Sequence, residues 1–127
     1  MTGDPRKILL VDDSALTLAV EEAILVAEGH EVRLATSVDE VVSVLESWEP
    51  DLVLTDVKMP GTDGTELCRL IKSQVHRLVP VILFSTLPDA DLAVLARRCG
   101  ADGYLSKSRG FDSLPAQVAD LCQQILW

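Results

Sequence analysis

The chain has 127 residues, the size of a single domain, and its 11 basic and 20 acidic residues give a formal net charge of −9. This negative charge disfavours direct contact with the anionic backbone of a nucleic acid. Hydrophobic residues make up 48% of the chain but aromatic residues only 4%. A core of Val, Leu, Ile and Ala is therefore expected, which is typical of buried parallel strands covered by helices.

The cysteines and the start of the chain indicate a reducing compartment. Cys68, Cys99 and Cys122 are odd in number and form no CxxC pattern, so we expect buried thiols. The polar start MTGDPRK does not match a secretory leader, and no apolar run approaches the ~20 residues that span a bilayer. We expect a cytoplasmic protein that makes no membrane contact.

Short aliphatic runs alternate with longer amphipathic stretches along the chain. The runs predict strands, and the stretches, whose apolar residues recur every three to four positions, predict helices. In chain order the predicted elements are a strand at 8–11, a helix at 14–28, a strand at 31–35, a helix at 41–48, a strand at 51–55, a helix at 65–74, a strand at 81–84, a helix at 89–98, a strand at 103–105 and a helix at 114–125. Strands that alternate with helices in this way predict an α/β fold with an open, doubly wound sheet.

Glycine and proline mark several of the predicted boundaries. Gly29 ends the first helix, Pro50 closes the second, and Pro115 falls in the first turn of the last helix, where a missing N–H costs nothing. The apolar residues that give the first helix its periodicity are Leu16, Val20, Ala23, Ile24 and Ala27.

Polar side chains follow four of the five predicted strands. In an open α/β sheet, ligands bind at the carboxyl ends of the strands, near the point where the strand order reverses. The polar strand ends are Asp12 and Asp13, Asp56, Ser85 and Thr86, and Lys107. Any one of these aspartates alone would be read as a helix N-cap, and Asp12 or Asp13 can serve as one as well. Four polar strand ends together predict a functional site.

The residue types at these strand ends favour phosphoryl chemistry. Three neighbouring carboxylates would repel one another unless a cation lay among them, and Mg2+ prefers oxygen ligands while it also holds a substrate phosphate. The hydroxyl of Ser85 and the ammonium of Lys107 would complete a cradle for a phosphoryl group.

These segments resemble a known family. The runs ILLVDDS, LVLTDVKMPGTDG, PVILFST and GADGYLSK are similar to the receiver domain of two-component response regulators, the fold of the chemotaxis regulator. The resemblance covers about residues 6–126, and we expect one receiver domain over residues 1–127. It implies a flavodoxin-like sheet of five parallel strands in the order 2-1-3-4-5, with five helices. That order makes the first and third strands neighbours and brings Asp12, Asp13 and Asp56 to one site.

The resemblance also implies a role for each site residue. Asp56 would be the phosphoacceptor, which takes a phosphoryl group from the phosphohistidine of a sensor histidine kinase or phosphotransfer protein. Mg2+ would be held by Asp12, Asp13, Asp56 and the backbone carbonyl of Lys58. Lys107 would pair with one phosphoryl oxygen, and Ser85 would donate a hydrogen bond to another.

The output that the resemblance implies is a change of protein contacts. Tyr104 stands at the place of an aromatic switch coupled to Ser85, and the Met59-Pro60-Gly61 turn and Gly64 shape the loop after Asp56. The downstream target would bind the face built from the fourth helix, fifth strand and fifth helix. Activity would be limited to self-phosphotransfer and autodephosphorylation.

Three residues depart from the family pattern. Ser108 replaces the proline that usually follows the lysine, Thr86 replaces a small residue, and the usual phenylalanine is displaced to Phe111. A cis peptide costs roughly 2.5–4 kcal/mol without proline. We therefore expect a trans Lys107–Ser108 bond, with the deviation absorbed between Ser108 and Phe111 and helped by Gly110.

Two other functions remain open at this point. A degenerate receiver would bind partners without phosphorylation, although the polar strand ends are intact. A phosphatase of the haloacid dehalogenase type would need DxDx[TV] after the first strand, where this chain has VDDS. The chain also lacks the GxGxxG pattern of dinucleotide enzymes, and an aspartate pair would repel the phosphate of FMN.

Overall fold

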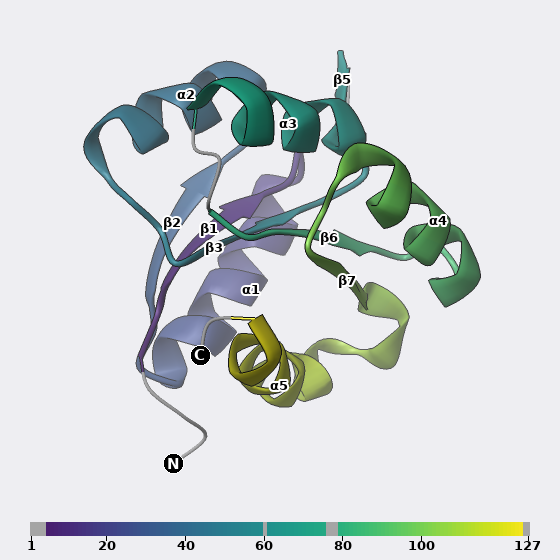
Figure 1. The fold of residues 1–127 in the computed structure, drawn as a ribbon. Coiled ribbons are helices and arrows are strands. Elements are labelled where there is room, and N and C mark those ends of the chain that lie inside the picture. The colour runs from purple at the N-terminus through teal and green to yellow at the C-terminus, as the bar shows by residue number, and fades with distance from the viewer. Residues whose placement is uncertain (1–4, 60, 76–78, 126–127) are drawn as a thin grey trace.

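A five-stranded parallel sheet forms the centre of the molecule (Figure 1). The structure, a computed structural model, describes residues 5–59, 61–75 and 79–125, without the side chains of residues 62, 74 and 75. The sheet strands are β1 (Lys7–Val11), β2 (Glu31–Ala35), β3 (Leu52–Thr55), β6 (Val81–Ser85) and β7 (Gly103–Ser106). Their order is β2-β1-β3-β6-β7, so the predicted order 2-1-3-4-5 is confirmed for the five sheet strands.

Five α-helices connect and cover these strands in the described part of the chain. They are α1 (Ala15–Ala27), α2 (Val38–Ser47), α3 (Gly64–Leu70), α4 (Asp89–Cys99) and α5 (Leu114–Ile125). A π-helical turn, η1 (Ile71–Val75), extends α3, and two 3-10 turns, η2 (Lys107–Arg109) and η3 (Phe111–Ser113), lead into α5. None of the helices described here has the length and apolar character needed to cross a bilayer.

A short antiparallel hairpin follows β3, where the sequence predicts only a turn. It pairs β4 (Lys58–Met59) with β5 (Thr62–Asp63). Pro60, in the middle of the predicted turn, lies outside the described residues. The hairpin leads directly into α3, whose N-cap is Asp63.

The helices divide between the two faces of the sheet (Figure 1). On one face, α1 and α5 pack on strand residues such as Ile8, Leu10 and Leu54. On the other face, α2, α3 and α4 pack on the alternate strand residues, such as Leu9 and Val53. Successive side chains of a strand point to opposite faces, so a strand that is apolar at every position fills both layers of core.

Side-chain hydrogen bonds cap the N-termini of α1 and α2. Ser14 caps α1 by accepting from the N–H of Thr17 at 3.2 Å. At α2, Ser37 accepts from the N–H of Glu40, while the Glu40 carboxylate accepts from the N–H of Thr36 at 2.6 Å. This reciprocal pair of bonds resembles a capping box and explains why β2 ends in a cap rather than in a site residue.

The apolar residues that predict α1 lie mainly on its outer side. Leu16 is 77% exposed, Val20 and Val26 are also exposed, and the inward positions are Leu18, Glu21 and Leu25. The helix has only three polar residues and is therefore apolar on nearly every side. Periodicity consequently identifies the helix correctly but not the face that packs on the sheet. The result is an exposed apolar strip and a buried glutamate.

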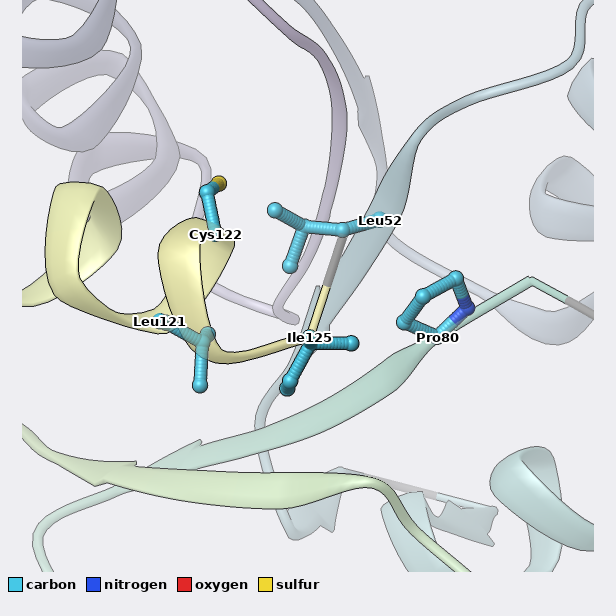
Figure 2. A pocket seen from close by; sticks show the side chains of 5 residues that line it. All are labelled: Leu52, Pro80, Leu121, Cys122 and Ile125. Carbon is cyan, nitrogen blue, oxygen red and sulfur yellow. The ribbon is translucent and has the colours of Figure 1, made fainter. Parts of the chain in front are cut away.

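A small apolar pocket lies at the end of the sheet opposite the polar strand ends. Figure 2 shows Leu121, Cys122 and Ile125 of α5 beside Leu52 of β3 and Pro80. Leu52 begins β3, whereas Asp56 follows its last residue. The space between these side chains does not admit a water-sized ligand, so this end of the sheet serves packing.

Gly64 lies against the backbone of Asp56 too closely for a side chain. A Cβ added at Gly64 would lie 2.0 Å from the carbonyl oxygen of Asp56, and the N–H of Gly64 donates to the carbonyl of Val57 at 2.7 Å. The clash is with backbone, which cannot yield as a side chain can. We therefore predict that Gly64→Ala lowers the free energy of unfolding by about 1–3 kcal/mol, measured by urea unfolding.

Gly103→Ala is the matched control for this prediction. The added Cβ there would meet the flexible Cδ1 of Ile82 at 3.4 Å, so the expected loss is much smaller. Equal losses at the two glycines would show that the approach to Asp56 is not the constraint.

Candidate phosphoryl-transfer site

The paired strands bring three carboxylates together at one edge of the sheet. Asp12 and Asp13 follow β1, and Asp56 follows β3, the neighbour of β1. One carboxylate oxygen from each of these residues lies within 4.8 Å of the others. Asp12 is buried, Asp56 is half-buried and Asp13 is exposed, so the cluster opens to solvent on the Asp13 side. The juxtaposition predicted from the strand order is therefore present.

Lys107 reaches into this cluster from the end of β7. Its Nζ lies 2.6 Å from Oδ2 of Asp12 and 3.7 Å from Oδ2 of Asp56. A third carboxylate, Oε2 of Glu21, lies 4.0 Å from the same nitrogen. The ammonium also lies 5.2 Å from the centroid of the Phe84 ring, a cation–π distance. Lys107 is thus held by Asp12 within reach of Asp56.

Backbone hydrogen bonds orient the two inner aspartates. The N–H of Asp12 donates to the carbonyl of Ala35, and the N–H of Asp56 donates to the carbonyl of Val11, which extends the strand pairing by one residue. Oδ1 of Asp12 accepts from the N–H of Ser14 at 2.9 Å. Oδ1 of Asp56 accepts from the N–H of Val57 at 2.7 Å. The backbone of Lys58 also hydrogen-bonds the Asp56 carboxylate. Oδ2 of each aspartate is the oxygen that lies nearest Lys107 in its ion pair.

Burial and neighbouring charges together set the pKa values of Asp56 and Lys107, and both pKa values are raised. Burial raises the pKa of Asp56; Lys107 opposes the rise and Asp12 adds to it. Burial by itself would lower the pKa of Lys107, but the hydrogen bond to Asp12 and the charges of the surrounding carboxylates outweigh burial and raise it. Lys107 therefore stays charged and is the cation of the site.

Ser85 and Tyr104 lie on the neighbouring strands β6 and β7. Ser85 is buried at the end of β6, and its Oγ accepts from the N–H of Leu87 at 3.2 Å. Thr86 is exposed. Tyr104, on β7, is 36% exposed and lines a groove of about 190 Å³ together with Gln117 and other residues of α5.

Ser108 makes a hydrogen bond that proline could not make. Its N–H donates to Oγ of Ser106 at 3.2 Å, and the two hydroxyls are 2.5 Å apart. No peptide bond between the described residues is cis, so the expected trans Lys107–Ser108 bond is confirmed. Gly110, at φ +84°, turns the chain from η2 into η3. The change from the family pattern is therefore accommodated between Lys107 and Phe111.

Glu21 is a site neighbour that the sequence-based prediction missed. It is 2% exposed on the inner face of α1, and among the described residues its Oε2 has no hydrogen-bond partner. Burial raises its pKa to about 7, which Lys107 opposes and the charges of Asp12 and Asp56 reinforce. The sequence did carry a signal for its burial: Glu21 lies three residues after Leu18 and four before Leu25, the spacing of residues on one face of a helix.

The raised pKa of Glu21 predicts a pH-dependent cost to the fold. A carboxyl that ionises near pH 7 when folded, but near 4.5 when unfolded, makes the folded state bind more protons between these values. Stability from this group therefore falls as pH rises from about 4.5 to 7. We predict that Glu21→Gln, which cannot ionise, gains about 1–3 kcal/mol over wild type at pH 8 and little at pH 5, by urea unfolding.

Glu22→Gln, on the half-exposed neighbour, serves as the control and should keep the wild-type pH profile. A gain for Glu21→Gln that is the same at both pH values would contradict the buried charge as its cause.

Comparison with known proteins agrees with this geometry. The model of the response regulator receiver domain family matches residues 8–119. The chemotaxis response regulator CheY4 of Vibrio cholerae has a similar fold, with a TM-score of 0.83, 24% identity, and 93% of this chain and 99% of that chain covered.

Two further solved structures are more similar in sequence. A CheY-like receiver domain protein of Methanospirillum hungatei has a TM-score of 0.81 at 26% identity, covering 95% of this chain and 96% of that one. The signal receiver domain of a histidine kinase from Syntrophus aciditrophicus has a TM-score of 0.79 at 34% identity, covering 94% and 92%. The match over most of the chain, together with the strand order and the acidic cluster, shows that this protein belongs to the response regulator receiver domain family.

Proposed function

We propose that this receiver domain is a phosphoacceptor of a two-component system or phosphorelay, in which Asp56 takes a phosphoryl group from a phosphohistidine. The donor would be a sensor histidine kinase or a phosphotransfer protein. The observation that carries the proposal is the position of Asp56, whose carboxylate lies between an acidic, metal-suited cluster and the ammonium of Lys107, 3.7 Å away.

The transfer would be a displacement at phosphorus. Oδ1 of Asp56 accepts from the N–H of Val57, and we assign the role of nucleophile to Oδ2, which lies 3.7 Å from Lys107 Nζ. Its oxygen forms the new O–P bond while the P–N bond of the phosphohistidine breaks and its electron pair returns to the imidazole. Lys107 offsets the negative charge that develops on the phosphoryl oxygens. The Ser85 hydroxyl, whose oxygen already accepts from Leu87, keeps its proton to donate to one of them.

The acidic cluster fits a hard divalent cation such as Mg2+. The carboxylates of Asp12, Asp13 and Asp56 and the backbone carbonyl of Lys58 would hold it, and all four supply the oxygen ligands that Mg2+ prefers. When bound, the ion supplies positive charge against both the cluster and the phosphoryl group. Asp13 is exposed on the open side of the cluster, where a hydrated ion can enter.

Two surfaces suit the protein partners of such a module. The exposed apolar strip of α1, which begins at Leu16 three residues after Asp13, offers a docking surface beside Asp56 for the donor. For the target we propose the face of α4, β7 and α5, where Tyr104 lines the groove against α5. In this proposal Tyr104 would act as an aromatic switch coupled to Ser85. We place the protein in the cytoplasm, with no activity beyond self-phosphotransfer and autodephosphorylation.

Asp56→Asn tests the phosphoacceptor. In the presence of Mg2+ and acetyl phosphate, the wild-type protein should gain one acid-labile adduct of about 80 Da, seen by intact mass spectrometry. The variant lacks the nucleophilic oxygen and should gain none, whereas Asp63→Asn, at the end of β5, should behave as wild type because Asn can also cap α3. Absence of any adduct on the wild-type protein would favour the alternative, a degenerate receiver that binds partners without phosphorylation.

Mg2+ should stabilise the protein because it relieves repulsion in the cluster. Bound at ten times its dissociation constant, a ligand adds about 1.4 kcal/mol to the free energy of unfolding. We therefore expect 10 mM Mg2+ to raise the melting temperature by a few degrees at constant ionic strength, and Asp13→Ala to abolish the rise. Asp39→Ala, an exposed acid on α2, is the control. A rise that survives Asp13→Ala would place the ion elsewhere.

Phosphorylation should change the dynamics of the output face. The expected change is a shift between two packings of Tyr104, so amide exchange should alter in α4, β7 and α5 when the protein is phosphorylated. The measurement is hydrogen exchange with and without phosphodonor, with Asp56→Asn as the control. Changes confined to α2 would contradict this output route.

A further inference from the structure

Glu21 is a buried charge for which packing gives no reason. It occupies the inner face of α1 between Leu18 and Leu25, in the apolar layer between α1 and the sheet. Its Oε2 has no hydrogen-bond partner among the described residues. A buried carboxylate oxygen without a hydrogen bond is costly, and an apolar residue of similar volume at such a position is often neutral or stabilising. A residue that served packing alone would therefore be apolar.

The only cation recorded near Glu21 in the described residues is Lys107. The Lys107 ammonium lies at nearly the same distance from Oδ2 of Asp56, 3.7 Å, as from Oε2 of Glu21, 4.0 Å. Neither distance is a hydrogen bond, and the one short contact, 2.6 Å, is to Asp12. Three carboxylates therefore share one ammonium. The charge of Glu21 offsets part of the positive charge that Lys107 presents to Asp56.

We propose that Glu21 is a positioning residue that restrains Lys107: its negative charge holds the ammonium back from Asp56 and so slows phosphoryl uptake. This inference rests on the proposed phosphoacceptor function and concerns the regulation of that same site. The incoming phosphoryl group, which carries close to two negative charges, competes with Glu21 for Lys107. The site therefore takes up a phosphoryl group only as the Lys107 ammonium moves away from Glu21.

The restraint of Lys107 depends on the negative charge of the Glu21 carboxylate. The charged groups that face Glu21 are Lys107 from the end of β7, Asp12 from the end of β1 and Asp56 from the end of β3. The assay is best run at pH 8, above the pKa of about 7 that burial gives Glu21, so that the carboxylate is ionised.

The test compares Glu21→Gln with Glu22→Gln in phosphoryl uptake at Asp56 from acetyl phosphate and Mg2+. Gln keeps the shape of the side chain and removes its charge, so Glu21→Gln should take up phosphate about three- to ten-fold faster than wild type. Glu22→Gln should match wild type. In a Lys107→Gln background the acceleration should disappear, because the charge of Glu21 acts through Lys107. A residue with a merely structural role would not show this dependence on Lys107.

A second measurement does not depend on phosphorylation. In a crystal structure of Glu21→Gln, Lys107 Nζ should move from 3.7 Å to hydrogen-bonding distance of Asp56 Oδ2. Equal uptake rates, an acceleration that persists without Lys107, a Glu21→Gln protein that does not fold, or an unmoved Lys107 would each overturn the inference. If the wild-type protein takes up no phosphate at Asp56, the proposed function fails, and the position of Lys107 in the variant still decides the role of Glu21.

Discussion

The pairing of β1 with β3 is the constraint on which the site depends. Because β1 lies at the centre of one half of the sheet, with β2 on one side and β3 on the other, its last residue and that of β3 end side by side. Val11 lies opposite Thr55, so the residues that follow, Asp12 and Asp56, emerge at the same level. All the parallel strands have their carboxyl ends at the same edge of the sheet. The loops that lead from these ends into the crossover helices therefore lie together and can carry the polar groups of a site.

The second constraint is the excess of negative charge around Lys107, and it links the site to the core because one of the carboxylates is the buried Glu21. Three carboxylates, those of Asp12, Asp56 and the buried Glu21, lie within 4.0 Å of the Lys107 ammonium, and Asp13 adds a further acid to the cluster. The fold tolerates these charges because Lys107, from the end of β7, lies 2.6 Å from Asp12, and because Asp13 is exposed to solvent. A site that is unbalanced in this way is suited to a cation and to a phosphoryl group, each of which changes the electrostatic balance when it arrives.

The sequence was sufficient to predict most of the fold, because each strand and helix has a local signal. Aliphatic runs of four or five residues stand between turn residues, and Ser14, Ser37 and Asp63 begin helices through their own side chains. The β4–β5 hairpin was missed because each of its strands has two residues, too few for any periodicity. The face of α1 that packs on the sheet was not predicted, since a helix that is apolar on nearly every side carries no mark of its inner face.

The sequence by itself determined the order of elements, the residue types at each strand end and, through resemblance, the family. These follow from local pattern, in which a residue and its near neighbours in the chain decide the outcome. Only the tertiary structure decided which groups share the charge of Lys107. Glu21 and Lys107 are 86 positions apart in the chain, and their approach at 4.0 Å depends on how α1 lies against the sheet. Contacts of this kind come from the packing of whole elements, and no local pattern encodes them.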